Sequence, residues 1–193
     1  MGTFIEDGKG AGNIAEVDNK QRLLVKSSSF VGEEVEAKEG NSFVLHGECH
    51  VAAATNGALF YFKNTSSTFN VFITRILIDG HSLTDDFIIR QVFDPTRSNG
   101  TSTTAVNKNR GSGKTLVGDF FISDGSSDMT FTGGTQYHAF PIKTLTTDVR
   151  DMQGSNILTP NTAVGFNWAT VDGANAVNGE IISISMNIYL EEI

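Results

Sequence analysis

The chain consists largely of short segments in which apolar and polar residues alternate, separated by polar turns. The clearest segment is EIISISMNIYL at residues 180–190, where every second position from Ile182 to Leu190 is apolar. Strict alternation points one set of side chains toward a core and the other toward polar surroundings, as in a half-buried strand. The same criteria predict strands at residues 42–53, 58–63, 69–79, 87–93, 115–123, 129–131, 138–142, 163–170 and 180–190.

About eight strands at a spacing of roughly ten residues are typical of an antiparallel β-sandwich or barrel. The sequence shows little that could form a long helix, so repeated β–α–β units are not expected. We therefore predict an all-β sandwich domain over residues 30–193. Residues 146–154 (TTDVRDMQG) are the only segment compatible with a helical turn, and the charge run Glu33, Glu34, Glu36 and Glu39 is expected to be a solvated loop.

Two apolar runs flank the polar cluster 64–68 within residues 58–79, ALFYFKNTSSTFNVFITRILID. Aromatic and β-branched residues on both sides of a short polar turn predict a β-hairpin. Its side chains Leu59, Tyr61, Phe72 and Ile76 are expected to help fill a core or a subunit contact. Binding is then expected in the N-terminal segment and the loops.

Residues 1–29 differ in composition from the rest of the chain, with many Gly, charged and small residues. They cannot build a core alone, so they form either a mobile leader or an arm that becomes ordered on a neighbouring subunit. Two regular apolar pieces favour an extended N-terminal arm. Its predicted partner-binding residues are Ile14, Val17, Arg22, Leu23, Leu24 and Val25.

A long polar insertion, SNGTSTTAVNKNRGSGK, occupies residues 98–114. Loops of this length are usually functional or disordered. We predict that Asn107, Asn109 and Arg110 contact either a sister subunit or the outside of an assembly.

Composition narrows the range of partners. The 193 residues carry a formal net charge of −8, which argues against a nucleic-acid-binding surface of clustered Lys and Arg. The single Cys49 excludes an internal disulfide framework. No apolar run approaches the ~20 residues that span a bilayer, and no signal peptide is visible. We expect a soluble protein, made in a cytoplasm, that binds neither nucleic acid nor membrane.

Sequence patterns that resemble phosphate-binding or metal-binding motifs are better explained as ordinary turns and strands. Residues 111–115 (GSGKT) resemble the end of a phosphate-binding loop, but Lys108 occupies the place of the required first Gly, and a strand pattern follows.

His46, Glu48 and His50 would share one face of a strand and are a weak candidate for zinc or iron, although this spacing is also common on a solvent-facing strand. No Gly-x-Ser-x-Gly nucleophile motif is present. We expect no catalytic residues and no cofactor.

Four motifs, taken in order, resemble small virion structural proteins of tailed bacteriophages. They are the Gly-rich leader that runs from residue 10 into RLLV at 22–25, the strand end LFYFKN at 59–64, the NKNRGS loop at 107–112 and the LTPNTAVGF segment at 158–166. The resemblance covers most of the chain and implies a head decoration or cement protein, or a part of the tail or fibre. Cement proteins of this kind commonly have jelly-roll-like sandwiches and form trimers on the capsid surface. The family has no catalytic residues to carry over.

This resemblance leads to the expectation of a capsid decoration protein that stabilises the head by bridging major capsid protein subunits and by forming a homotrimer. Two alternatives stay open. A tail or fibre protein that binds a receptor or glycan would use loop aromatics such as Tyr137, Trp168 or Tyr189, although the alternation around Trp168 favours a core position. A cupin-like metalloprotein would use the candidate metal residues on the strand at 42–53.

Overall fold

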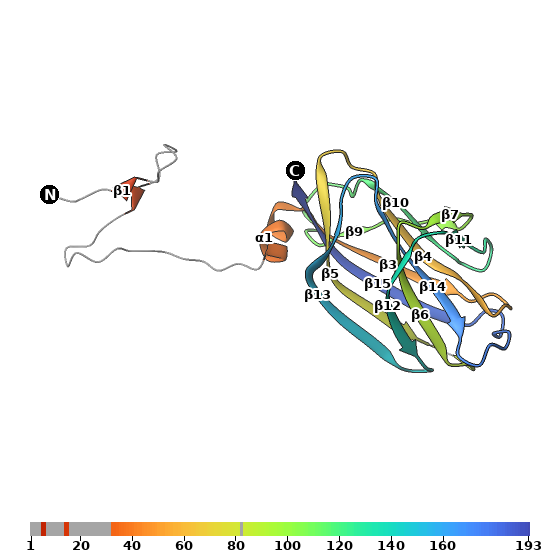
Figure 1. Ribbon diagram of the computed structural model, residues 1–193. Coiled ribbons are helices and arrows are strands. Elements are labelled where there is room, and N and C mark those ends of the chain that lie inside the picture. Colours follow the sequence, from red (N-terminus) through yellow and green to blue (C-terminus); the bar gives the residue numbers. More distant parts are fainter. Residues whose placement is uncertain (1–4, 7–13, 16–31, 82) are drawn as a thin grey trace. The chain divides into compact units, whose positions relative to one another are not determined.

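The computed structural model describes residues 5–6, 14–15, 32–81 and 83–193, and the chain divides into two compact units. The first unit is Met1–Val31, in which β1 (Ile5–Glu6) and β2 (Ile14–Ala15) pair antiparallel. The second unit, Gly32–Ile193, is an antiparallel β-sandwich (Figure 1). The predicted all-β sandwich class is thereby confirmed.

Within the described residues, eight strands of seven or more residues build the sandwich. In chain order they are β3 (Ser42–His50), β4 (Asn56–Asn64), β5 (Phe69–Gly80), β6 (Phe87–Phe93), β12 (Thr135–Ile142), β13 (Thr147–Leu158), β14 (Ala163–Thr170) and β15 (Ile181–Glu192). One sheet has the order β13-β5-β15-β3-β9, and the other has the order β12-β6-β14-β4-β10-β8.

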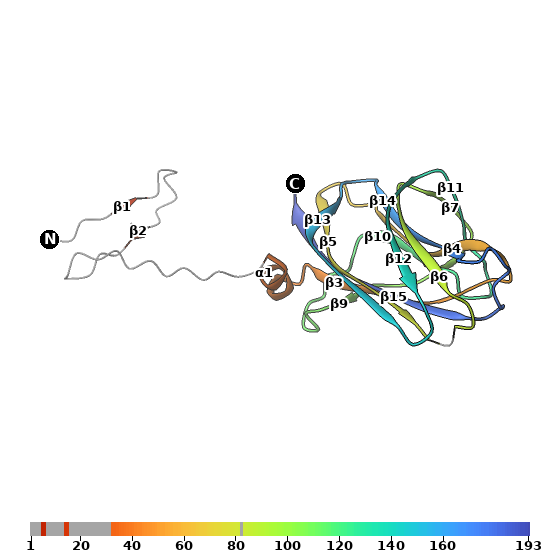
Figure 2. The ribbon, with the colours of Figure 1, turned by 60° about the horizontal axis from the view of Figure 1, so that its bottom comes forward.

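The long strands are wound as a jelly roll. Numbered one to eight along the chain, they follow the order 6-3-8-1 in one sheet and 5-4-7-2 in the other, so the chain repeatedly crosses between sheets. Figures 1 and 2 show the two sheets packed face to face. Such winding is found in viral capsid and lectin domains, and it shows a fold without showing a function.

Short strands complete the sheets. β10 (Gly118–Ile122) and β8 (Thr101–Ser102) extend the six-stranded sheet beyond β4, and β9 (Val106–Asn107) extends the five-stranded sheet beyond β3. β7 (Thr96–Ser98) and β11 (Thr130–Thr132) form a separate two-stranded sheet. The predicted polar insertion at 98–114 therefore contains two short edge strands.

The predicted hairpin at residues 58–79 is wrong, although both of its strands exist. β4 pairs with β10 and β14, whereas β5 pairs with β13 and β15, so the two strands lie in opposite sheets. The polar cluster between them forms a corner of the sandwich around the fully buried Asn64. Local sequence signals a turn there, but the pairing of each strand is decided by strands far along the chain.

One continuous apolar core fills the space between the sheets. The alternation predicted for β15 is confirmed, because Ile182, Ile184 and Met186 are fully buried. Leu59 and Trp168 also lie in this core, as predicted for both. The geometry thus removes Trp168 as a surface platform for a sugar.

Two residues of the predicted hairpin lie outside this core. Tyr61 is buried in a small cluster with Ala58, Met129 and Ala163. Phe72 is partly exposed and stacks on Tyr189, with ring centroids 4.8 Å apart and planes 3° from parallel.

The charge run that was expected to be a loop is helix α1 (Gly32–Glu39), so that prediction is wrong. Glu, Ala and Lys are good helix formers, and acidic residues near the N-terminus favour the helix dipole. The helix ends at Gly40, whose φ of 78° is left-handed. There the Gly40 amide donates to the Ala37 carbonyl at 3.2 Å, and the Asn41 amide donates to the Glu36 carbonyl at 2.7 Å.

The expected helical turn at 146–154 is also wrong, because these residues lie mostly in β13. This strand pairs antiparallel with β5, with a register shift between Asp151 and Asn156. Pairing along β5 stabilises an extended backbone that local sequence alone does not reveal.

Candidate functional site

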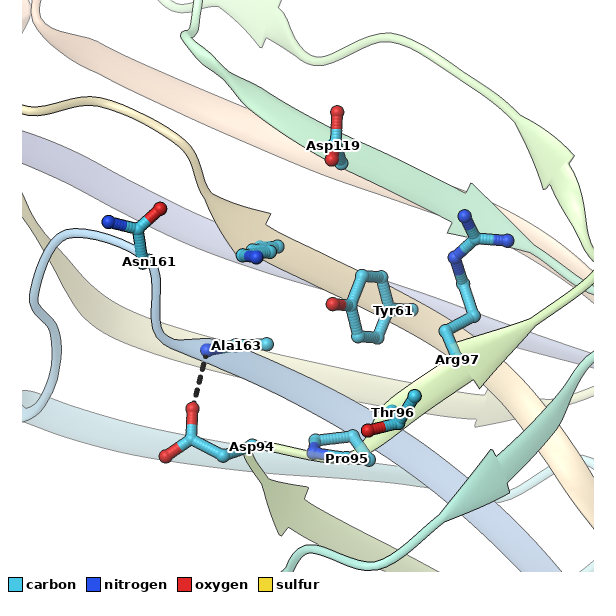
Figure 3. A pocket seen from close by; sticks show the side chains of 9 residues that line it. Tyr61, Asp94, Pro95, Thr96, Arg97, Asp119, Asn161 and Ala163 are labelled. Atoms are coloured by element: carbon cyan, nitrogen blue, oxygen red, sulfur yellow. Dashed lines mark hydrogen bonds between the residues drawn. The ribbon is translucent and has the colours of Figure 1, made fainter.

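A polar hollow of about 360 Å³ lies on the outer face of the six-stranded sheet (Figure 3). It is bounded by β4, β10, β7, the turn between β6 and β7, and the start of β14. The nine residues that line it are Tyr61, Lys63, Asp94, Pro95, Thr96, Arg97, Asp119, Asn161 and Ala163.

The hollow has a buried floor and a charged rim. Tyr61, Pro95 and Ala163 are buried, and the phenol ring of Tyr61 and the Pro95 ring supply most of the carbon atoms of the floor. Around them stand two carboxylates and two cationic side chains, with an amide and a hydroxyl between them. Those rim residues are Asp94, Asp119, Lys63, Arg97, Asn161 and Thr96.

Aromatic rings hold Arg97 in place. The central carbon of its guanidinium lies 3.5 Å from the centroid of the Phe121 ring and 5.6 Å from that of Tyr61. Its Nη1 donates a hydrogen bond to the carbonyl of Asn99. Its Nε is buried and finds no hydrogen-bond acceptor within the described part of the chain. Stacking therefore fixes the guanidinium plane while leaving one donor unsatisfied.

Two turns place an acidic and an amide side chain at the rim. Asp94 and Asn161 both have left-handed backbones, with φ of 52° and 67°, which Asp and Asn tolerate better than most residues. Oδ1 of Asp94 accepts a bond from the Ala163 amide at 2.8 Å (Figure 3). The Asn161 amide donates to the carbonyl of Asn64 at 2.8 Å. Both turns are thus fixed by the protein itself.

The phenol of Tyr61 remains a hydrogen-bond donor at neutral pH. Burial raises its pKa, the charge of Arg97 opposes that shift, and Asp119 and Asp94 raise the pKa further. The hollow thus combines fixed donors and acceptors in one place. Such an arrangement can bind a polar molecule by hydrogen bonds.

The candidate metal residues do share one face of β3. His46 and Glu48 are exposed and His50 is partly exposed, while the intervening Gly47 and Cys49 are buried. Nδ1 of His46 lies 2.8 Å from the Ser185 hydroxyl. Among the residues that the structure describes, no group of three or more His, Cys, Asp or Glu side chains is arranged to hold a metal ion. The shared face alone therefore gives the metal hypothesis no geometric support.

Two of the three predicted contact residues of the polar insertion, Asn107 and Asn109, form hydrogen bonds to the chain's own backbone. Nδ2 of Asn107 donates to the Gly40 carbonyl at 2.8 Å, and Nδ2 of Asn109 donates to the Lys38 carbonyl at 3.0 Å. Both bonds bind the loop to the end of helix α1, where backbone carbonyls need donors. Arg110 is exposed. A contact between these residues and a partner stays a prediction.

Of the predicted arm residues, only Ile14 lies within the described residues, and its backbone pairs with Glu6 across β1 and β2. Val17, Arg22, Leu23, Leu24 and Val25 lie outside the described residues. Of the candidate sugar-binding aromatics, Tyr137 is exposed on β12, and Tyr189 stacks on Phe72.

Comparison of the chain with protein-family models, curated proteins and solved structures finds no significant match. Across the described ranges, none of the helices has the length and apolar character needed to cross a membrane.

The sequence did not reveal the polar hollow. Its lining residues come from four separate segments between residues 61 and 163, and none of these segments carries a recognised motif. The one local signal is the turn-forming pair Asp94-Pro95, which marks a turn without indicating what the turn adjoins.

Proposed function

We propose that this chain is a bacteriophage virion structural protein that decorates the capsid surface and bridges major capsid protein subunits. The ordered sequence motifs and the jelly-roll winding support this proposal. The observation that carries it is a pair of long, exposed sheet edges on one side of the sandwich.

β12 ends the six-stranded sheet and β13 ends the five-stranded sheet, and the two strands lie side by side in both ribbon views (Figures 1 and 2). Tyr137 on β12 is 52% exposed, and Val149 and Ile157 on β13 are 48% and 46% exposed. Edge strands present unpaired backbone donors and acceptors that proteins usually cover or protect. Exposed apolar side chains beside such edges favour a protein partner.

The opposite side of the sandwich is different. There the sheets end in β8 and β9, which have two residues each. Very short edge strands are a common protection against unwanted pairing. We therefore assign the β12–β13 side to subunit contacts, in a homotrimer whose three copies multiply weak contacts with the capsid lattice.

We propose that the first unit, Met1–Val31, is an arm that binds a neighbouring subunit. The chain divides into this unit and the sandwich unit, Gly32–Ile193. An arm of this length adds contact area on a neighbouring subunit with little added mass.

Cryo-electron microscopy of virions that contain this chain tests the proposal. We expect sandwich density on the outer capsid surface, in contact with more than one capsid protein subunit. Density confined to the tail would contradict decoration and favour a receptor-binding role.

A substitution tests the assigned surface. Tyr137→Glu is expected to weaken self-association in light-scattering measurements, because it places a charge on the β12 edge. Val171→Glu is the matched control, since Val171 is 58% exposed in the segment after β14. Equal association by both variants would contradict the assignment.

A further inference from the structure

We propose that the polar hollow on the outer face of the six-stranded sheet binds a single neutral sugar residue of a glycan. This inference goes beyond capsid decoration and does not depend on it. It rests on the size of the hollow, on its lining, on its balanced charge and on the fixed position of the Arg97 guanidinium.

Size limits the ligand. The hollow offers about 360 Å³, near the lower end of the ~300–1,000 Å³ of small-molecule sites. One sugar ring fits this space, with the rest of a glycan extending into solvent through the open side. A nucleotide or an extended peptide would need more enclosed surface.

The lining offers groups that suit both the apolar face and the hydroxyl groups of a sugar ring. A pyranose has a face of C–H groups and a rim of hydroxyl groups that both donate and accept hydrogen bonds. Tyr61, Pro95 and Ala163 offer a buried, carbon-rich floor, on which an apolar face can pack. Asp94 and Asp119 at the rim can accept from hydroxyl groups.

Charge balance disfavours an ionic ligand. Two carboxylates share the rim with Lys63 and Arg97, so their formal charges cancel. An anion would lie close to Asp94 and Asp119, and a cation would lie close to Lys63 and Arg97. A neutral polyol uses the donors of one pair and the acceptors of the other without opposing charge.

Arg97 supplies a fixed cationic donor at the rim. Its guanidinium stacks on Phe121 at 3.5 Å and its Nη1 donates to the Asn99 carbonyl, so the group is held in one orientation. The other Nη hydrogens can donate to sugar oxygens. A donor held in place loses little conformational freedom when a ligand binds.

The experiment uses the full chain labelled with ¹⁵N. Methyl glycosides of glucose, galactose, mannose and N-acetylglucosamine are titrated separately, with sodium phosphate and sodium acetate as ionic probes. We expect one or more glycosides to bind saturably and to shift the Nε–H resonance of Arg97. The ionic probes should leave that resonance unchanged.

Two variants locate the site. Asp119→Asn should weaken glycoside binding about tenfold or more, since it removes a charged acceptor. Thr96→Trp should abolish binding by filling the hollow from its exposed rim. Glu192→Gln, at the end of β15 in the other sheet, removes one carboxylate elsewhere and should leave binding unchanged. Unchanged urea midpoints show that each variant is folded.

Three outcomes would overturn the inference. The first is no saturable binding by any glycoside in the panel. The second is glycoside binding that survives both Asp119→Asn and Thr96→Trp. The third is saturable binding of phosphate or acetate alone, which would make the hollow an anion site.

Discussion

The side-chain Nδ2 of Asn64 donates a hydrogen bond of 2.9 Å to the backbone carbonyl of Leu158, ninety-four residues further along the chain. The same Nδ2 donates to the Phe69 carbonyl at 2.9 Å, and Oδ1 accepts from the Ser66 amide at 3.0 Å. One fully buried side chain therefore joins the end of β4, the start of β5 and the end of β13. This corner is where the chain crosses from one sheet to the other.

Replacing this side chain should be costly. Asn64→Ala leaves a buried carbonyl, a partly buried carbonyl and a buried amide without their partner, so we expect a loss of about 2–4 kcal/mol in the free energy of unfolding. Urea denaturation measures the change. Asn56→Ala is the control, because Asn56 is exposed at the start of β4 and its Nδ2 donates to the hydroxyl of the adjacent Thr55 at 3.3 Å. Equal losses in the two variants would contradict the role assigned to the corner.

The thiol of Cys49 should be unreactive in the native protein. Its side chain is fully buried in the core, and burial strongly raises its pKa, so that the reactive thiolate is scarce. A thiol-specific disulfide reagent should modify almost none of the folded protein and one thiol per chain in concentrated urea. Rapid labelling under native conditions would show that the core around β3 opens readily.

The polar insertion offers a test that separates structure from binding. Asn107→Ala removes the bonds to the carbonyls of Gly40 and Lys114, and we expect a loss of about 1–3 kcal/mol in stability. Arg110→Ala is expected to change stability by less than ~0.5 kcal/mol, because the side chain is exposed. If Arg110 contacts a partner, as predicted, only its substitution will weaken capsid binding without changing the urea midpoint.

The loop after β10 should lose stability in acid. Hydrogen bonds from the side chains of Ser126 and Thr101 lower the pKa of Asp124 from 3.8 to about 2. Because the folded pKa lies below the unfolded one, the stabilising contribution is present above about pH 4 and is lost as the pH falls toward about 2.

Asp124→Asn removes this titration. The stability difference between the wild type and Asp124→Asn should therefore be largest near pH 5 and should shrink as the pH approaches about 2. Urea midpoints across this range measure it. A constant difference would show that the carboxylate charge does not stabilise the loop.

Removing the first unit tests the arm hypothesis. A chain that begins at Gly32 retains the whole described sandwich, so it should give a strand-rich circular dichroism spectrum and a cooperative urea transition. Its affinity for capsids that lack the full chain should fall at least about tenfold, as expected from the loss of contact area. Unchanged affinity would place all binding on the sandwich and would contradict the proposed arm.

Local pattern was enough to place most strands. The segments predicted at 87–93 and 163–170 match β6 and β14 residue for residue, because each side chain there is selected by burial on a pleated strand. The pattern failed for β13, whose TTDVRDMQG segment has mixed polarity and lies at a sheet edge, where burial imposes little alternation. It also failed for helix α1, which is short and too polar to show an apolar stripe.

Alternation, turn residues and composition by themselves determined the fold class of this protein and core-facing positions such as those of residues 182–190. These properties depend on each residue and its near neighbours. Only the tertiary structure decided that β4 and β5 separate at Asn64, that two long edges meet at β12 and β13, and that Asp94, Arg97 and Asp119 surround one hollow. Those relationships join residues distant in sequence, and in a jelly roll the crossing of strands between two sheets creates them.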